Sequence, residues 1–451
     1  MIRSLIFFVM GFLLSFLTTP WVINLSKRGF GLDDANETRK RHEGLIPRIG
    51  GMPIMFTLSI GLIIILSIRP EYSTDWFPVL LGSVLMFAVG LWDDLVSLNS
   101  KAKFGCQIAI ATLVYFLGLS IDRVTYPGGA WSVELHGWSL PITVFWLIAV
   151  PNIINLIDGF DGLAGGLGLF MAMTLGIVGI ISEQIAVAWY SFTMAGALLG
   201  FLVFNFPPAR VFLGDGGAYL IGFSIAALSM TSSHKGSIAA VLLVTIVALG
   251  VPILDTSFAL LRRAFRGFPL FAADDEHIHH RLENLGFSKR RIVLGMYGIC
   301  VVLSVIGLSI FWSQGRTIPI AIGAIFLLTI FAAQYLQYIK NWANLRKQVE
   351  RILVRRPLVQ YALLQAQLME IEVERCTNGE EFWPLFDSAL RRIGFVDTPG
   401  AESHHEIQVK WNGTKRWILH APDSIGSDIE WQRIAECFRP VYVKAMTKWS
   451  R

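Results

Sequence analysis

The stretch Pro151-Asn-Ile-Ile-Asn-Leu-Ile-Asp-Gly-Phe-Asp-Gly-Leu163 ends a strongly apolar run with two amides and two carboxylates, at Asn152, Asn155, Asp158 and Asp161. A charged group costs about 2.5–3.5 kcal/mol at the centre of a bilayer, so these side chains are candidates for function. Their three-residue spacing from Asn155 onward lets them share a helix face, while Gly159 and Gly162 can loosen that helix end and let a ligand approach the backbone. Carboxylate and amide oxygens suit a hard cation such as Mg²⁺. The alternative is an ordinary polar helix end at the water interface.

The composition indicates a membrane protein. The chain has 451 residues, of which 54% are hydrophobic and 16% charged, whereas soluble domains carry about 25% charged residues. The net charge of +5 is modest and gives no indication of nucleic-acid binding. The four cysteines form no CxxC pair, which argues against a disulfide framework or a zinc ribbon.

Eleven apolar segments approach the roughly 20 residues that a membrane-spanning helix needs. They lie at residues 4–25, 50–68, 76–96, 104–120, 138–156, 163–181, 185–204, 212–230, 238–261, 292–312 and 317–338. The first could be a signal peptide, but no small-residue cleavage site follows it, so we interpret it as the first span. The sequence therefore predicts an all-α polytopic membrane domain over residues 1–338, with about 11 transmembrane helices.

The basic residues predict which loops face the cytoplasm. Loops on alternate sides hold 16 and 5 Lys and Arg residues, and the positive-inside rule places the richer set in the cytoplasm. This set comprises residues 26–49, 97–103, 205–211 and 262–291. With eleven spans, the N-terminus is then outside and the C-terminus inside.

Three further motifs fall on the same predicted side as the Asn/Asp stretch, which predicts a single cytoplasmic-face site. The adjacent carboxylates of Asp93 and Asp94 repel each other unless a cation or a lysine relieves them. Such a pair can bind metal or act as a general base, or it is a solvated helix end. Asp215, in the motif Gly214–Gly217, can bind Mg²⁺ or cap a helix.

The third motif carries three imidazoles and a guanidinium, at His277, His279, His280 and Arg281. These groups can bind a pyrophosphate or a sugar, with a zinc site or surface histidines as alternatives. Lys101 and Lys103 can hold a phosphate or anchor a span on the cytoplasmic side. The basic segment 39–51 can attract an anionic headgroup or reflect the same positive-inside bias.

Together these motifs resemble the polyprenyl-phosphate N-acetylhexosamine-1-phosphate transferase family, over roughly residues 1–338. The resemblance rests on Asp93-Asp94, Lys103, the 152–163 stretch, Gly214-Asp215 and the 277–281 motif. It implies a site that depends on Mg²⁺, which Mn²⁺ could replace, at the cytoplasmic face of a bacterial plasma membrane. It also implies transfer of a sugar 1-phosphate from a UDP-sugar to a polyprenyl phosphate, with release of UMP.

The same resemblance implies roles for individual residues. Asp215 and Asn155 would coordinate the metal, while Asp93 and Asp94 would act catalytically near the lipid phosphate together with Asp215. The implied substrate-binding residues are Lys103, Asn152, Asp158, Gly159, Asp161, His277, His279, His280 and Arg281. Among them, Asp158, Gly159 and Asp161 would lie near the uridine, and the 277–281 motif would meet the pyrophosphate and the sugar.

The order His-Ile-His-His-Arg resembles the N-acetylglucosamine-1-phosphate branch of that family. We therefore expect UDP-GlcNAc as donor and undecaprenyl phosphate as acceptor, at the start of lipid-linked glycan synthesis for cell-wall polysaccharide or lipopolysaccharide O-antigen. UDP-GalNAc or an N-acetylated deoxysugar is left open. A one-step attack oriented by Asp93 or Asp94 is preferred, and a two-step path through an aspartyl phosphate is left open.

Residues 339–451 are more polar than the rest, with 17 Lys and Arg and 14 Asp and Glu from residue 340 onward. Simpler family members end before this tail. The pattern predicts helices at 340–373 and 429–446 and a β-hairpin with an Asn-Gly turn at 409–418. We expect a small cytoplasmic α+β domain. It would bind a protein partner or regulate the enzyme, or else serve stability alone; a homodimer is also left open.

Two functions without transferase activity compete with this reading. A transporter places charged residues near the bilayer midplane, often in repeats, whereas here the charges gather at one face and no internal repeat is visible. A membrane-anchored assembly protein would need the tail but not the aspartates.

Overall fold

The structure is a computed structural model that describes residues 2–26, 46–96, 98–126, 131–231, 238–250, 286–335, 345–395, 404–412, 415–422 and 428–449, with a few isolated positions between 253 and 283. The chain divides into two compact units. Unit 1 comprises Met1–Asp34, Glu43–Ser257 and Asp275–Tyr338. Unit 2 comprises Ala35–His42, Phe258–Asp274 and Ile339–Arg451.

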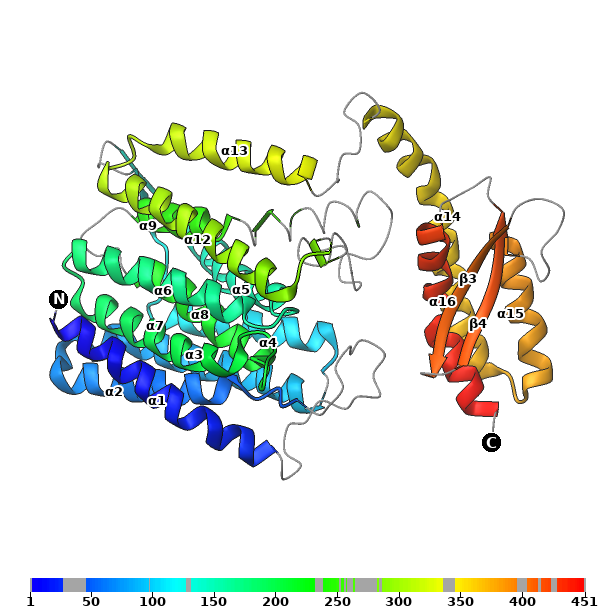
Figure 1. The fold of residues 1–451 in the computed structure, drawn as a ribbon, viewed down its shortest axis with the longest axis horizontal. Helices are drawn as coiled ribbons and strands as arrows, with labels where there is room; N and C mark the ends of the chain where they lie inside the picture. Colours follow the sequence, from blue (N-terminus) through cyan, green and yellow to red (C-terminus); the bar gives the residue numbers. More distant parts are fainter. Residues whose placement is uncertain are drawn as a thin grey trace. The chain divides into compact units, whose positions relative to one another are not determined.

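Unit 1 is a bundle of helices, and Figure 1 shows its long helices running roughly side by side. They are α1 (Ile2–Ser26), α2 (Gly51–Ile68), α3 (Ser73–Val96), α4 (Ser100–Phe116), α5 (Ser139–Ile157), α6 (Leu163–Ile181), α7 (Ile185–Asn205), α8 (Gly214–Thr231), α9 (Ile238–Ala248), α12 (Lys289–Trp312) and α13 (Ile318–Tyr335). Each of the eleven predicted spans overlaps one of these helices, although α9 covers only the first part of the predicted span 238–261.

Seven helical stretches within the described residues are long and apolar enough to cross a membrane. They are built on α1, α2, α3, α5, α6, α7 and α12. The remaining four helices are shorter or less apolar over the described residues. A multi-pass membrane protein is therefore supported, while the count of eleven spans stays a prediction.

A small β-hairpin between α4 and α5 was not predicted from the sequence. Strands β1 (Arg123–Thr125) and β2 (Ser132–Glu134) pair antiparallel, with Val124 opposite Val133. Arg123 also forms an ion pair with Glu134. Strands of three residues are too short for an alternating hydrophobic pattern to show.

The core of unit 1 is built around α7 and α8, whose side chains are buried along almost their whole length. Helices α1 and α6 pack on α7, and α3 and α5 pack on α8. Because α8 is surrounded by protein, it does not need a face apolar enough for lipid. This explains how it carries a charged residue in its first turn.

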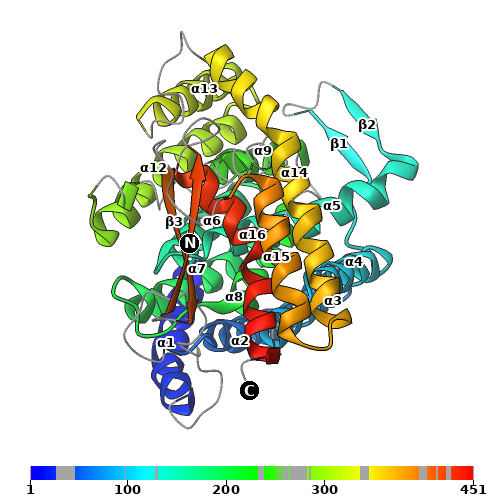
Figure 2. The same cartoon turned by 90° about the vertical axis from the view of Figure 1, so that its right-hand side faces the viewer.

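The described residues of unit 2 form three helices and a hairpin that share one hydrophobic core. The elements are α14 (Leu345–Arg375), α15 (Gly379–Ile393), β3 (His404–Asn412), β4 (Lys415–Pro422) and α16 (Asp428–Trp449). Figure 2 shows the three helices side by side. The strands pair antiparallel with Val409 opposite Trp417, and Asn412 ends β3.

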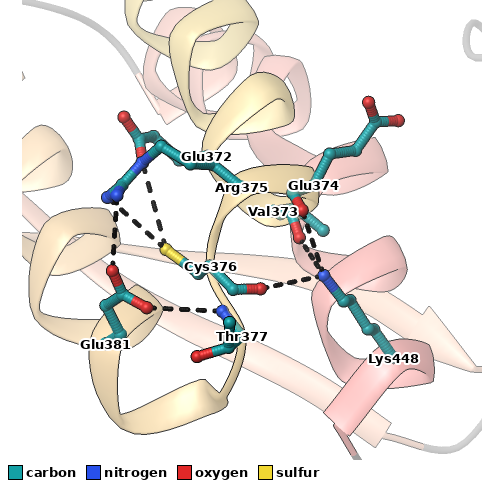
Figure 3. A network of polar contacts seen from close by, with 8 residues as sticks. All are labelled: Glu372, Val373, Glu374, Arg375, Cys376, Thr377, Glu381 and Lys448. Atoms are coloured by element: carbon teal, nitrogen blue, oxygen red, sulfur yellow. Dashed lines mark hydrogen bonds and ion pairs between the residues drawn. The ribbon is translucent and has the colours of Figure 1, made fainter.

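Lys448 of α16 closes the C-terminal end of α14 (Figure 3). Its ammonium donates to the carbonyl oxygens of Val373 at 2.6 Å and Cys376 at 3.0 Å. The last carbonyls of a helix have no partner within the helix, and a cation there also complements the helix dipole. The contact ties α14 and α16 together.

Candidate active site

Glycines bring the C-terminal end of α3 and the start of α2 against the first turn of α8. A Cβ atom on Gly90 would lie 2.5 Å from the backbone of Asp215, and one on Gly51 would lie 2.5 Å from the backbone nitrogen of Gly217. No side chain fits at such distances. The close crossing places Asp93 and Asp94, one turn beyond Gly90, beside the start of α8.

Asp94 caps helix α8. Its Oδ1 accepts from the backbone N–H of Asp215 at 2.9 Å, and its Oδ2 accepts from that of Gly216 at 3.0 Å. These N–H groups would otherwise lack partners at the helix start, where a negative charge also complements the helix dipole. The sequence predicted Asp215 as a metal ligand or as the residue that caps this helix. The carboxylate that caps α8 belongs instead to Asp94 of α3.

Asp93 and Asp215 share the ammonium of Lys103. The Lys103 Nζ atom lies 2.6 Å from Oδ2 of Asp93 and 2.6 Å from Oδ2 of Asp215. The other Asp93 oxygen accepts from the backbone N–H of Leu98 at 2.7 Å. The predicted relief of the Asp93-Asp94 repulsion is therefore present: one carboxylate meets backbone amides and the other meets a lysine.

Helix α5 contributes two amide side chains on the side facing α4 and α8. Asn155 lies close enough to Asp215 for the two side chains to interact. One turn earlier, Asn152 Nδ2 donates to Gln107 Oε1 at 2.7 Å and to the carbonyl of Ile148 at 2.8 Å. Gln107 lies one turn beyond Lys103 on α4, so the two helices face each other along one polar line.

The predicted shared helix face does not extend past Asp158. Helix α5 ends at Ile157, and the backbone N–H of Asp158 bonds to the carbonyls of Ile154 and Asn155. Asp161 lies in the following turn, where its Oδ2 accepts from the backbone N–H of Ala209 at 3.3 Å. The turn forms because Gly162 adopts a φ of +76°, a conformation that favours glycine. Gly159 is exposed in this turn.

Two residues that sequence reasoning missed fix this turn. Asn205 is buried; its Oδ1 accepts from Gly162 N–H at 3.0 Å, and its Nδ2 donates to the carbonyl of Val211 at 2.8 Å. Tyr297 of α12 donates to the carbonyl of Gly162 at 2.5 Å. An isolated Asn at the end of an apolar helix was a signal for Asn205, whereas Tyr297 has no local pattern.

Asp158 lies in an environment that is unfavourable for a negative charge. Burial raises the pKa of Asp158 well above its ordinary value, and the negative charges of Asp215 and Asp94 raise it further. Arg48 acts in the opposite direction and interacts electrostatically with Asp94 as well. Asp158 therefore lies within electrostatic reach of the cluster around Asp215.

The structure thus brings five predicted site residues into one cluster: Asp93, Asp94, Lys103, Asn155 and Asp215. Asp158 lies within electrostatic reach of this cluster, Asn152 extends it along α5, and Asp161 and Gly159 belong to the adjoining turn. The predicted residues His277, His279, His280 and Arg281 lie outside the described residues.

The donor set of the cluster fits a hard divalent cation. Two carboxylates and an amide converge, and a cationic group, the Lys103 ammonium, already lies between the carboxylates. Within the described residues, no group of three or more His, Cys, Asp or Glu side chains forms a metal site. Mg²⁺ is commonly held by only one or two carboxylates, with substrate phosphates and waters completing its shell.

Known proteins are similar in sequence to this chain over the part that holds the cluster. A family model described as glycosyl transferase family 4 matches residues 76–233, which include all five cluster residues. The chain is 34% identical over 331 residues to the probable undecaprenyl-phosphate N-acetylglucosaminyl 1-phosphate transferase of Bacillus subtilis, covering 73% of this chain and 90% of that protein.

Two other relatives carry related names. The decaprenyl-phosphate N-acetylglucosaminephosphotransferase of Mycobacterium tuberculosis is 33% identical over 315 residues, or 64% of this chain and 78% of that protein. The phospho-N-acetylmuramoyl-pentapeptide-transferase of Listeria monocytogenes is 30% identical over 321 residues, or 67% of this chain and 96% of that protein.

Proposed function

The chain belongs to the polyprenyl-phosphate N-acetylhexosamine-1-phosphate transferase family, and on this premise we propose that it transfers GlcNAc-1-phosphate from UDP-GlcNAc to undecaprenyl phosphate. UMP leaves, and the product starts a lipid-linked glycan. The observation that carries the proposal is the cluster of Asp93, Lys103, Asn155 and Asp215. The B. subtilis relative supports the choice of sugar and lipid by its name.

The cluster suits a reaction between two phosphorylated substrates. Both reactants are anionic, so the site must offset their mutual repulsion and hold them in line. A bound Mg²⁺ would supply positive charge to the donor diphosphate, held by Asp215 and Asn155. Lys103 adds a positive charge that can contact phosphate oxygens.

Asp93 is better placed than Asp94 to orient or deprotonate the acceptor phosphate. Both oxygens of Asp94 accept from backbone N–H groups at the start of α8, which cannot leave without disturbing the helix. Asp93 Oδ2 is held by the flexible side chain of Lys103 instead, which can move toward a phosphate and release that oxygen. We assign the donor uridine to the turn that carries Asp158, Gly159 and Asp161.

We place the cluster and unit 2 on the cytoplasmic side of a bacterial plasma membrane, because the loops predicted on that side hold most of the basic residues. The acceptor lipid cannot leave the bilayer, whereas nucleotide sugars are soluble. A site at the inner surface of the membrane meets both substrates.

Transfer of radiolabel from UDP-GlcNAc to a butanol-extractable lipid tests the proposal. Membranes containing the protein should form the labelled lipid with undecaprenyl phosphate, and EDTA should abolish its formation. Asp215→Ala should lower the rate by at least about a hundredfold, the range seen when a group that stabilises transition-state charge is removed. Asp75→Asn, at an exposed aspartate at the start of α3, is the matched control.

Transfer that persists in EDTA, or near-normal turnover by Asp215→Ala, contradicts the proposed site. A panel of UDP-sugars in the same assay decides between GlcNAc, GalNAc and N-acetylated deoxysugars. If another sugar is transferred much faster than GlcNAc, the donor assignment is wrong although the reaction class stands.

We propose that unit 2 is an accessory module that binds a protein partner or regulates the enzyme. Its described elements share a core of their own, and all five cluster residues belong to unit 1. Deleting residues 345–451 should leave transfer by the folded membrane unit within about twofold. Loss of transfer with an unchanged melting temperature of that unit would show that unit 2 takes part in catalysis.

A further inference from the structure

An ammonium lies between two carboxylates where the proposed function requires a divalent cation. Lys103 on α4 contacts Asp93 on α3 and Asp215 on α8, each at 2.6 Å. The three side chains are only 20%, 16% and 27% exposed, respectively. Partial burial weakens solvent screening, so the contacts are stronger than an ordinary surface ion pair.

We propose, building on the function assigned above, that Lys103 is a built-in competitor of the divalent cation. In the metal-free enzyme its single positive charge offsets part of the negative charge of Asp93 and Asp215. When the cation binds, Lys103 releases the Asp215 carboxylate. The Lys103 ammonium then has Asp93 and the donor phosphates as its partners.

The available oxygens make the two cations compete. Asp93 Oδ1 is occupied by the backbone N–H of Leu98, and the Oδ2 atoms of both aspartates already accept from Lys103. A divalent ion on the Asp215 carboxylate would have a unit positive charge about one ion-pair distance away. The repulsion between these charges lowers the affinity of the site for metal as long as Lys103 remains in place.

The side chain of Lys103 is suited to move between partners. Its charge is compact and sits on a flexible stem, and an ammonium has three donors of which the structure uses two on carboxylates. Donor phosphates would attract the released ammonium and remove its repulsion of the metal. Metal and donor should therefore raise each other's affinity by the same factor, as linkage requires.

Mn²⁺ binding to the purified full-length protein, measured without substrates by the loss of the free-ion electron paramagnetic resonance signal, tests this inference. Lys103→Met removes the charge, and we expect it to bind Mn²⁺ at least about tenfold more tightly than the wild type. Lys103→Arg keeps the charge and should stay within about twofold. Lys101→Met removes the same charge two residues away and should also change little, because Lys101 is exposed.

Unchanged or weaker Mn²⁺ binding by Lys103→Met overturns the inference. Equal tightening by Lys103→Met and Lys103→Arg also overturns it, because the cause would then be a loosened site and not the lost charge. Wild-type protein that binds Mn²⁺ but transfers no sugar phosphate refutes the proposed function, whereas the competition is still judged by the binding data.

A measurement on the wild type covers the case in which Lys103→Met does not fold. An amine-reactive ester should modify Lys103 slowly without metal, because two carboxylates hold its ammonium. Saturating Mn²⁺ should increase that rate several-fold, with Lys101 in the same peptide map as the internal control. Modification of Lys103 that is unchanged or slowed by Mn²⁺ contradicts the release from Asp215.

Discussion

Replacing Asp94 by alanine separates a capping role from a catalytic one. Two hydrogen bonds, of 2.9 and 3.0 Å, join its carboxylate to the first turn of α8. Hydrogen bonds to a charged group contribute about 1.5–3 kcal/mol each, and loss of a helix cap costs about 0.5–2 kcal/mol. Because water can replace part of these contacts, we expect Asp94→Ala to lower the free energy of unfolding of unit 1 by about 2–3 kcal/mol.

Asp94→Asn should have about half of that effect, because the amide keeps one acceptor oxygen but turns an NH₂ group toward the second N–H. The apparent melting temperatures of the three proteins in detergent, measured alongside transfer of labelled GlcNAc-1-phosphate, test this order. We expect the highest melting temperature for the wild type, a lower one for Asp94→Asn and the lowest for Asp94→Ala. An alanine variant that melts like the wild type yet transfers nothing would refute the capping argument and make Asp94 a catalytic group.

Three further predictions concern the surroundings of the cluster. Gly90→Ala should lower the melting temperature and abolish transfer, because its Cβ would overlap the backbone of Asp215; Gly105→Ala, with open space around it, should leave the melting temperature unchanged. Asn205→Ala should cost about 2–3 kcal/mol of stability, because it leaves buried backbone groups without partners. The raised pKa of Asp158 means that its ionised form is disfavoured in the folded state. The metal-free wild type should therefore lose stability as the pH rises from about 4 through that raised pKa, a loss that melting curves of Asp158→Asn should not show.

The sequence was a good guide to the helices of unit 1 because lipid and protein both demand long apolar runs there. It missed elements whose signals are local and short. The β1–β2 hairpin has only three residues in each strand. In unit 2, helix α15 was missed although Asn378 caps its start by accepting from the N–H of Glu381, and Gly394 follows its end. Those capping signals were present but were not used.

The sequence predicted which polar residues gather better than it predicted the contacts between them, and their roles stay predictions. The polar residues stood out because charge is costly in apolar runs, and five of them do meet. Their partners could not be predicted, since the contacts of Lys103 and Asp94 with α8 join residues more than 110 positions apart. The shared helix face did not extend beyond Asp158, because α5 ends at Ile157 and Gly162 adopts a turn conformation. The two glycines of the stretch had indicated such a loosened helix end.

The adjacency of Asp93 and Asp94 has a geometric explanation. Successive side chains on an α-helix point about 100° apart, and the two neighbouring carboxylates at the end of α3 have different partners. One reaches the backbone N–H groups of α8, and the other reaches the lysine on α4. Helix α3 fixes the position of Asp215 through Asp94, and it influences the charge environment of Asp215 through Asp93. The longer glutamate side chain should therefore have a different effect at each position. Asp94→Glu should lower the stability of α8, whereas Asp93→Glu should change the affinity of the site for metal.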